Sequence, residues 1–121
     1  MLAGNFFELA SVNSENGKLT GVIKLNAAHT IFQGHFPGQP VVPGVCMMQI
    51  IREIMEVMSG KDLKLTAADS MKFLSVINPD QNSEVDVDIS YAEHADHYVV
   101  NATLFAAAVT FFKLKATMTF S

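Results

Sequence analysis

Residues 34–45 hold the groups of this chain that are best suited to acid–base chemistry. His35 carries an imidazole, whose ordinary pKa lies near neutrality, so it is a natural general acid or base. Three of the chain's four prolines and three of its seven glycines fall in the same segment. Proline fixes φ and has no backbone N–H, so the segment cannot be a central strand or the middle of a helix. We therefore expect a stiff, extended loop that presents His35 and ends at a helix start.

A helix is expected over residues 46–58, directly after this loop. Apolar side chains cover nearly its whole circumference, and its polar side chains are confined to one narrow stripe at helical spacing. The stripe consists of Gln49, Arg52, Glu53 and Glu56. Because a helix that is apolar on almost every side must be enclosed by other structure, we expect this one to be wrapped by the rest of the chain.

Gly44 and Cys46 lie at the start of that helix, where the first backbone N–H groups have no partner within the helix. The N–H of Gly44 and the positive end of the helix dipole are suited to polarising a carbonyl oxygen as negative charge develops on it. The plainer alternative is that Gly44 only permits the turn. A thiolate at Cys46 would be stabilised in the same place, but no second motif supports a nucleophile, so we interpret Cys46 as a packing residue.

The remainder of the chain predicts antiparallel strands. Apolar and polar residues alternate in several segments, as in a strand with one buried face, and Asn16-Gly17 is a strong hairpin signal between the first two. The expected strands cover residues 5–12, 18–25, 64–77, 84–91, 97–105 and 112–120. The predicted fold class is therefore α+β, with a curved antiparallel sheet wrapped around one long central helix.

Composition limits the classes of function. The 121 residues are expected to form one domain, and because half are apolar and only 17% are charged, we expect surface to be hidden in an oligomer. A net charge of −4 without any basic run argues against nucleic-acid binding. A single cysteine, with no signal peptide or long apolar stretch, indicates a cytoplasmic protein without a membrane span. His94 and His97 around Asp96 match no known metal-site spacing, so no metal is expected.

The loop and the helix start together form a long motif of unusual composition. It reads Gly34-His35-Phe36-Pro37-Gly38, then Pro40, then Pro43-Gly44-Val45. This motif resembles the active-site segment of 3-hydroxyacyl-acyl-carrier-protein dehydratases. The resemblance implies a single hot-dog domain over residues 1–121, paired into dimers. It also implies loss of water across C2–C3 of a 3-hydroxyacyl thioester, giving the 2-enoyl thioester, in fatty acid or polyene-like biosynthesis. No metal or organic cofactor is implied.

The resemblance also assigns roles to residues. His35 matches the family histidine, which faces a helix carboxylate of the other subunit across the dimer boundary, and Gly44 matches the glycine that opens the helix. The residues expected to contact the substrate are Phe36, Pro43, Val45 and Met48.

The chain departs from the family pattern at Gln49, fourteen residues after the motif histidine, where the family has Asp or Glu. That acid would protonate the departing 3-hydroxyl, whereas an amide can only donate a hydrogen bond. In one interpretation Gln49 orients a water or the hydroxyl, and His35 carries both proton transfers slowly. In a second, Glu53 supplies the proton from one turn further on. In a third, the subunit is chemically weak and works beside an active homologue. A fourth is that the polar stripe is simply the solvated side of the helix, with Arg52 paired to Glu56.

The partner implied by the resemblance is an acyl carrier protein with a bound 3-hydroxyacyl chain. Such carriers are acidic, and Lys61, Lys64 and Lys72 would form a small basic patch that steers docking. The assembly expected is a homodimer, a higher oligomer of dimers, or a heteromer with an active homologue. Two other functions stay open, a non-catalytic subunit of a heteromeric dehydratase and an acyl thioesterase on the same fold.

Overall fold

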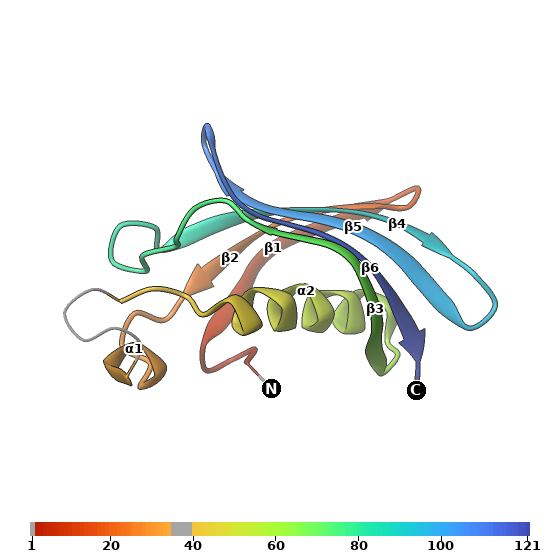
Figure 1. The fold of residues 1–121 in the computed structure, drawn as a ribbon, viewed down its shortest axis with the longest axis horizontal. Helices are drawn as coiled ribbons and strands as arrows, with labels where there is room; N and C mark the ends of the chain where they lie inside the picture. Colours follow the sequence, from red (N-terminus) through yellow and green to blue (C-terminus); the bar gives the residue numbers. More distant parts are fainter. Residues whose placement is uncertain (1, 35–39) are drawn as a thin grey trace.

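A six-stranded sheet curls over one long helix in the computed structural model, which describes residues 2–34 and 40–121. Figure 1 shows this helix lying beneath the concave face of the sheet. A curved antiparallel sheet around a central helix is the hot-dog architecture that the resemblance implies, so the predicted fold class is confirmed.

Apart from the short helix α1, which the sequence did not predict, the elements follow one another in the expected order. They are β1 (Phe7–Glu15), β2 (Lys18–Leu25), α1 (Ile31–Gly34), α2 (Gly44–Ser59), β3 (Leu63–Phe73), β4 (Glu84–Glu93), β5 (His97–Ala106) and β6 (Val109–Phe120). In the sheet the strands lie in the order β1-β2-β4-β5-β6-β3, and every neighbouring pair is antiparallel. β3 therefore forms one edge of the sheet although it directly follows α2 in the chain.

Alternation in the sequence decides which face of the sheet is buried. In β4, Val85, Val87 and Ile89 are buried toward the helix, whereas Asp88 and Ser90 point outward and are exposed. The same alternation in neighbouring strands gives the sheet one apolar concave face and one polar convex face. The Asn16-Gly17 hairpin is also confirmed, with φ of 51° and 77° at its two turn residues, as a two-residue turn between right-twisted strands requires.

The helix α2 begins at Gly44, two residues earlier than expected, and is enclosed by the sheet. Pro43 is its N-cap, with an extended backbone (φ −61°, ψ 147°), and Gly60 ends it in the left-handed conformation, donating its N–H to the carbonyl oxygen of Glu56 at 2.9 Å. Seven of its sixteen residues are buried. They are Cys46, Met47, Ile50, Ile51, Glu53, Ile54 and Met55.

The strand predicted over residues 64–77 is wrong beyond Phe73, where β3 ends. The N–H groups of Leu74 and Ser75 both donate to the carbonyl oxygen of Phe111, at 2.9 and 3.3 Å, so the chain turns out of the ladder there. It then meets the loop before α2, where the N–H of Val42 donates to the carbonyl oxygen of Ile77 at 2.9 Å. This crossing ties the end of the edge strand to the start of the helix.

The final hairpin also differs from the prediction, because β6 begins at Val109 and not at residue 112. Ala107 adopts a positive φ of 51°, which allows a tight turn without any glycine. Alanine rarely takes this conformation, so the residues of the turn did not indicate where the hairpin lies. Among the described residues, no helix is long and apolar enough to cross a membrane.

We predict that Ile54→Ala destabilises the protein by about 2–5 kcal/mol, because Ile54 is 1% exposed and its truncation leaves a cavity between helix and sheet. Val57→Ala on the same helix is the matched control: Val57 is 60% exposed, and its loss should change the free energy of unfolding by less than about 0.5 kcal/mol. Urea unfolding of both variants measures the difference, and equal effects would contradict the enclosure of the helix.

Candidate active site

The first turn of α2 presents backbone N–H groups at one end of the molecule. The carbonyl oxygen of Pro43 accepts the N–H groups of Cys46 and Met47, at 3.0 and 3.2 Å, and no side chain caps the helix. The N–H of Gly44 has no hydrogen-bond acceptor within the described part of the chain. A donor at the positive end of a 16-residue helix dipole is therefore available to a carbonyl oxygen beside Gly44.

The aromatic ring of Phe73 lies directly against Gly44. A Cβ atom added to Gly44 would lie 2.8 Å from Cε1 and 2.9 Å from Cζ of Phe73, which is closer than Cβ atoms approach other atoms in proteins. Phe73 stands at the end of β3, is 52% exposed and packs against Phe112 with ring centroids 5.0 Å apart. Glycine at position 44 thus lets an apolar ring approach the helix start closely.

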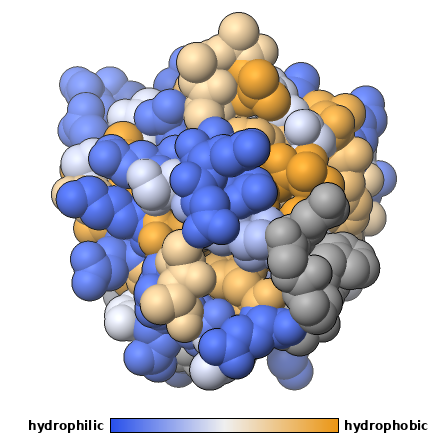
Figure 2. Space-filling model, turned by 90° about the vertical axis from the view of Figure 1, so that its left-hand side faces the viewer, coloured by the Kyte–Doolittle hydropathy of each residue, from blue (hydrophilic) through white to orange (hydrophobic). Residues whose placement is uncertain are grey.

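An apolar hollow of about 500 Å³ opens beside this contact. It is lined by the loop before α2, the helix start and the chain after β3, namely Val41, Val42, Pro43, Gly44, Met47 and residues 73–76. Figure 2 views the end of the molecule at which α2 begins and shows apolar side chains exposed there among polar ones. A hollow of this size and lining suits an acyl chain, with the Gly44 backbone as a polar group at its wall.

The predicted site residues stand in different relations to this hollow. His35 and Phe36 lie outside the described residues, so their roles stay predictions. Pro43 lines the hollow, whereas Val45 and Met48 do not belong to its lining, and the substrate contacts expected of all three stay predictions. Met47 and residues 73–76 complete the lining, and the fold puts them together because it brings the end of β3 to the helix start.

Cys46 is buried in the first helical turn, as a packing residue should be. Burial raises the pKa of its thiol, so the thiolate is disfavoured. His29 also has a structural contact, since its Nδ1 accepts the N–H of Ile31 at 3.1 Å and its ring packs edge-on against Phe6. His94 and His97 stack with ring centroids 4.6 Å apart, and the described residues contain no group of side chains able to hold a metal ion.

The polar stripe of α2 forms a connected hydrogen-bond network. Gln49 donates its Nε2 to Oε2 of Glu53 at 2.8 Å and accepts the Nε–H of Arg52 at its Oε1 at 3.2 Å. Arg52 Nη1 also donates to the carbonyl oxygen of Leu63 at 3.0 Å and pairs with Glu56 at 3.5 Å. The predicted Arg52–Glu56 pair is confirmed.

Glu53 is 0% exposed, so the interpretation of the stripe as a solvated face is wrong at this position. Its carboxylate accepts the N–H of Leu2 at 2.8 and 3.0 Å and the N–H of Ala3 at 2.8 Å. Burial alone would raise the pKa of this carboxyl, but the N–H groups of Ala3, Leu2 and Gln49 outweigh it and lower the pKa below its ordinary value. An ionised carboxylate has no proton to give, so this arrangement does not favour Glu53 as the acid.

The lysines considered for carrier docking are distributed differently from the expectation. Lys61 pairs with Glu93 at 3.7 Å and lies over the ring of Phe120, with its Nζ 4.0 Å from the centroid. Lys72 lies on the convex face of the sheet directly opposite Lys113 in the ladder, and Lys115 stands two residues along the same strand.

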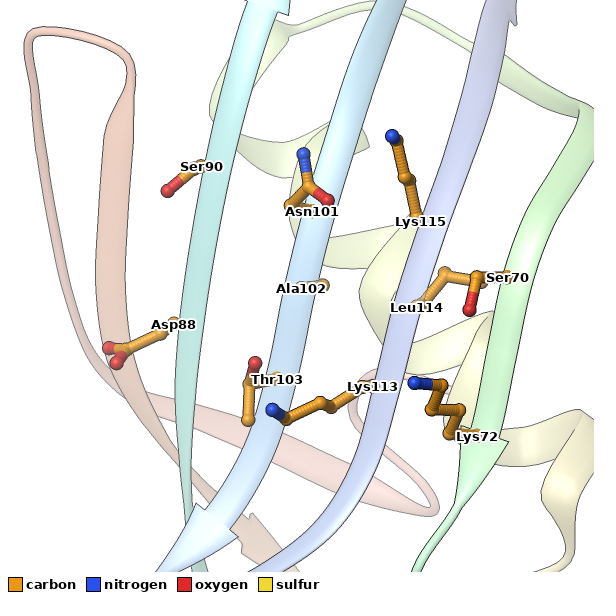
Figure 3. A pocket seen from close by; sticks show the side chains of 10 residues that line it. All are labelled: Ser70, Lys72, Asp88, Ser90, Asn101, Ala102, Thr103, Lys113, Leu114 and Lys115. Carbon is orange, nitrogen blue, oxygen red and sulfur yellow. The ribbon is translucent and has the colours of Figure 1, made fainter.

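Lys72, Lys113 and Lys115 border a shallow hollow of about 380 Å³ on the convex face (Figure 3). The side chains of Lys72 and Lys113 extend in the same direction across the strands. Like charges opposite each other destabilise a sheet, and no carboxylate of the described residues lies within 4 Å of any of the three. The basic hollow, as we name this cluster of Lys72, Lys113 and Lys115, therefore has three cations in its lining against one carboxylate, that of Asp88.

Comparisons with known proteins agree with this architecture. A solved structure described as the dehydratase heterocomplex ApeI:P from Xenorhabdus doucetiae superimposes with a TM-score of 0.73 at 17% identity, covering 92% of this chain and 96% of that one. A putative thioesterase, YhdA from Lactococcus lactis, superimposes with a TM-score of 0.68 at 7% identity, covering 96% of this chain and 92% of that one. At such identities these similarities show the fold alone.

Sequence relatives are more informative about the family. The 3-hydroxyacyl-[acyl-carrier-protein] dehydratase FabZ of Rickettsia massiliae is 27% identical over 103 residues, which are 78% of this chain and 67% of that enzyme. The FabZ of Lactobacillus helveticus is 40% identical over 55 residues, which are 40% of this chain and only 37% of that enzyme. The model of the ApeI-like family, described as ApeI dehydratase, matches residues 11–109. The chain therefore belongs to the ApeI-like dehydratase family.

Proposed function

We propose that this protein removes water from 3-hydroxyacyl groups that an acyl carrier protein presents as thioesters, giving 2-enoyl thioesters. The observation that carries the proposal is the apolar hollow beside the Gly44 N–H, at the positive end of a buried helix. The apolar lining of such a site can accept an alkyl chain while the Gly44 N–H polarises the carbonyl of the same molecule. Membership of a dehydratase family and FabZ relatives support the reaction class.

In the proposed reaction His35 takes the proton from C2 of the substrate. The electron pair of that C–H bond forms the C2=C3 double bond while the C3–O bond breaks. Negative charge grows on the thioester oxygen during this step, and the Gly44 N–H would stabilise it at a distance of about 2.7–3.1 Å. The dipole of α2 adds to this stabilisation because its positive end lies at Gly44.

Gln49 would take the place of the family acid at the departing hydroxyl. An amide donates a hydrogen bond but gives up no proton, so the proton that completes the leaving water must return from His35. Losing a dedicated acid typically costs a factor of about 10²–10⁴ in rate. We therefore expect turnover to be slow when this chain works alone.

The proposed site needs a second subunit. Val45, Phe73, Leu74 and Val76 are large apolar side chains exposed around the helix start and the end of β3, an amount of apolar surface that suits an interface. The partner is a second copy of this chain or an active homologue. The heteromeric alternative is favoured by Gln49 and by the description of the Xenorhabdus neighbour as a heterocomplex.

The direct test is an assay of the purified protein with a short 3-hydroxyacyl thioester, following the enoyl product. His35→Ala should lower turnover by at least about 10²-fold, since it removes the base. His94→Ala, a histidine in an exposed turn, should leave turnover unchanged. Turnover that appears only after an active homologue is added would establish the non-catalytic subunit, and release of free thiol without enoyl product would establish a thioesterase.

The Gly44 backbone has its own test. Gly44→Ala places a methyl group within 2.8 Å of the Phe73 ring and moves the carbonyl-binding wall, so kcat/KM should fall by about 10²-fold. Gly60→Ala at the other end of α2 is the control, because a Cβ there meets nothing within 4 Å; it should cost about 1 kcal/mol of stability through its positive φ and leave kcat/KM intact. Full activity in Gly44→Ala would contradict the role given to this residue.

If the acyl carrier protein docks at the basic hollow, changes there should affect KM for a carrier-bound substrate but not for a small thioester. Reversing both charges on β6 with Lys113→Glu and Lys115→Glu should raise KM for the carrier-bound substrate about tenfold, because electrostatic steering is lost, and leave KM for a small thioester unchanged. The matched control reverses Lys18 and Lys24 on the convex face of β2. Equal losses with both substrates would remove this surface from the docking model.

A further inference from the structure

Glu53 is the one charged or polar residue that is fully buried in the described part of the chain. A carboxylate is costly to remove from water unless its oxygens are satisfied by hydrogen bonds. Here the carboxylate accepts three N–H donors at 2.8–3.0 Å: the N–H of Leu2 is shared between Oε1 and Oε2, the N–H of Ala3 bonds to Oε1, and the amide of Gln49 bonds to Oε2. An apolar residue would fill the same place in the core without this cost, so a packing role does not account for the carboxylate.

The network permits only one orientation of the Gln49 amide. Its Nε2 faces the Glu53 carboxylate, which only accepts, and its Oε1 faces the Arg52 guanidinium, which only donates. A flipped amide would place oxygen against oxygen and N–H against N–H. Each end of the amide therefore keeps one fixed bond, and one N–H and one oxygen lone pair remain for another group.

The backbone of residues 2 and 3 also holds the Glu53 carboxylate. Their backbone N–H groups come from a segment fifty residues away in sequence, so the side chain of Glu53 joins that segment to the centre of α2. Without these two donors the carboxylate would lose most of its compensation for burial. The backbone of residues 2 and 3 thus holds the Glu53 carboxylate in place, and the carboxylate in turn holds the Gln49 amide.

We propose that Glu53 is a positioning residue, a buried anion anchored by the backbone of residues 2 and 3 that fixes the Gln49 amide as an oriented N–H donor. What that donor does to a substrate rests on the proposed function. How the amide is held does not, because it follows from the hydrogen bonds alone.

The first test observes the Gln49 side-chain amide by NMR in the wild-type protein and in Glu53→Met, which keeps an unbranched side chain of similar length but removes both acceptors. In the wild type, one Nε2–H should be protected from solvent exchange. In Glu53→Met that protection should be lost, together with the protection of the Leu2 and Ala3 amides. Glu53→Gln, which keeps one acceptor oxygen, should lie between the two.

Glu56→Met is the matched control, because Glu56 lies one turn further along the same helix and does not touch Gln49. It should leave all three amide protections in place. A mobile, unprotected Gln49 amide in the wild type, or unchanged protection in Glu53→Met and Glu53→Gln, would overturn the proposal. Because the wild-type measurement needs no variant, a failure of Glu53→Met to fold does not remove the test.

The second test separates positioning from general support of the fold. If Glu53 acts through Gln49, Glu53→Gln should lower kcat about tenfold at unchanged KM in the wild-type background and cause no further loss in a Gln49→Ala background. An equal loss in both backgrounds would overturn the positioning role. If the wild type shows no dehydratase turnover, the proposed function fails, and the NMR result alone decides how Gln49 is held.

Discussion

The enclosure of α2 by the sheet is the constraint on which the other features depend. The polar side chains on the covered face of this helix meet little water, because Glu53 is fully buried and Gln49, Arg52 and Glu56 are only partly exposed, so they satisfy one another. Gln49, Arg52 and Glu53 do so through direct hydrogen bonds, and Glu56 extends the network to the start of β3. The stripe that would be a solvated face on a surface helix becomes an ordered internal network on this one. Any chemistry at Gln49 is therefore tied to the burial of the helix.

A second consequence of the fold is that two distant segments meet at the helix start. The edge strand β3 leaves its ladder at Phe73 because the next two N–H groups turn to the carbonyl oxygen of Phe111. This departure places the Phe73 ring against Gly44 and opens the apolar hollow beside it. The polarising backbone and the apolar lining of the candidate site thus come from the crossing of β3 and α2, and not from the motif alone.

Local pattern was sufficient to predict most of the fold. Period-two alternation in residues 84–91 and the Asn16-Gly17 turn predicted strands that are confirmed, and the nearly continuous apolar surface of residues 46–58 predicted an enclosed helix. The burial of Glu53 could not be predicted, since polar residues at i, i+3, i+4 and i+7 describe a solvated face equally well. Its partners at residues 2 and 3 become visible only in three dimensions. The pairing of Lys72 with Lys113 depends in the same way on which strands become neighbours.

The most direct test of the account is a structure of the protein bound to a 3-hydroxyacyl analogue in which an amide replaces the thioester. The account predicts that the analogue's carbonyl oxygen accepts the N–H of Gly44, that its alkyl chain fills the hollow against Phe73, and that the free N–H of Gln49, in one subunit or its neighbour, reaches the 3-hydroxyl. An acyl chain bound elsewhere, or a Gly44 N–H that donates to the protein itself, would contradict it.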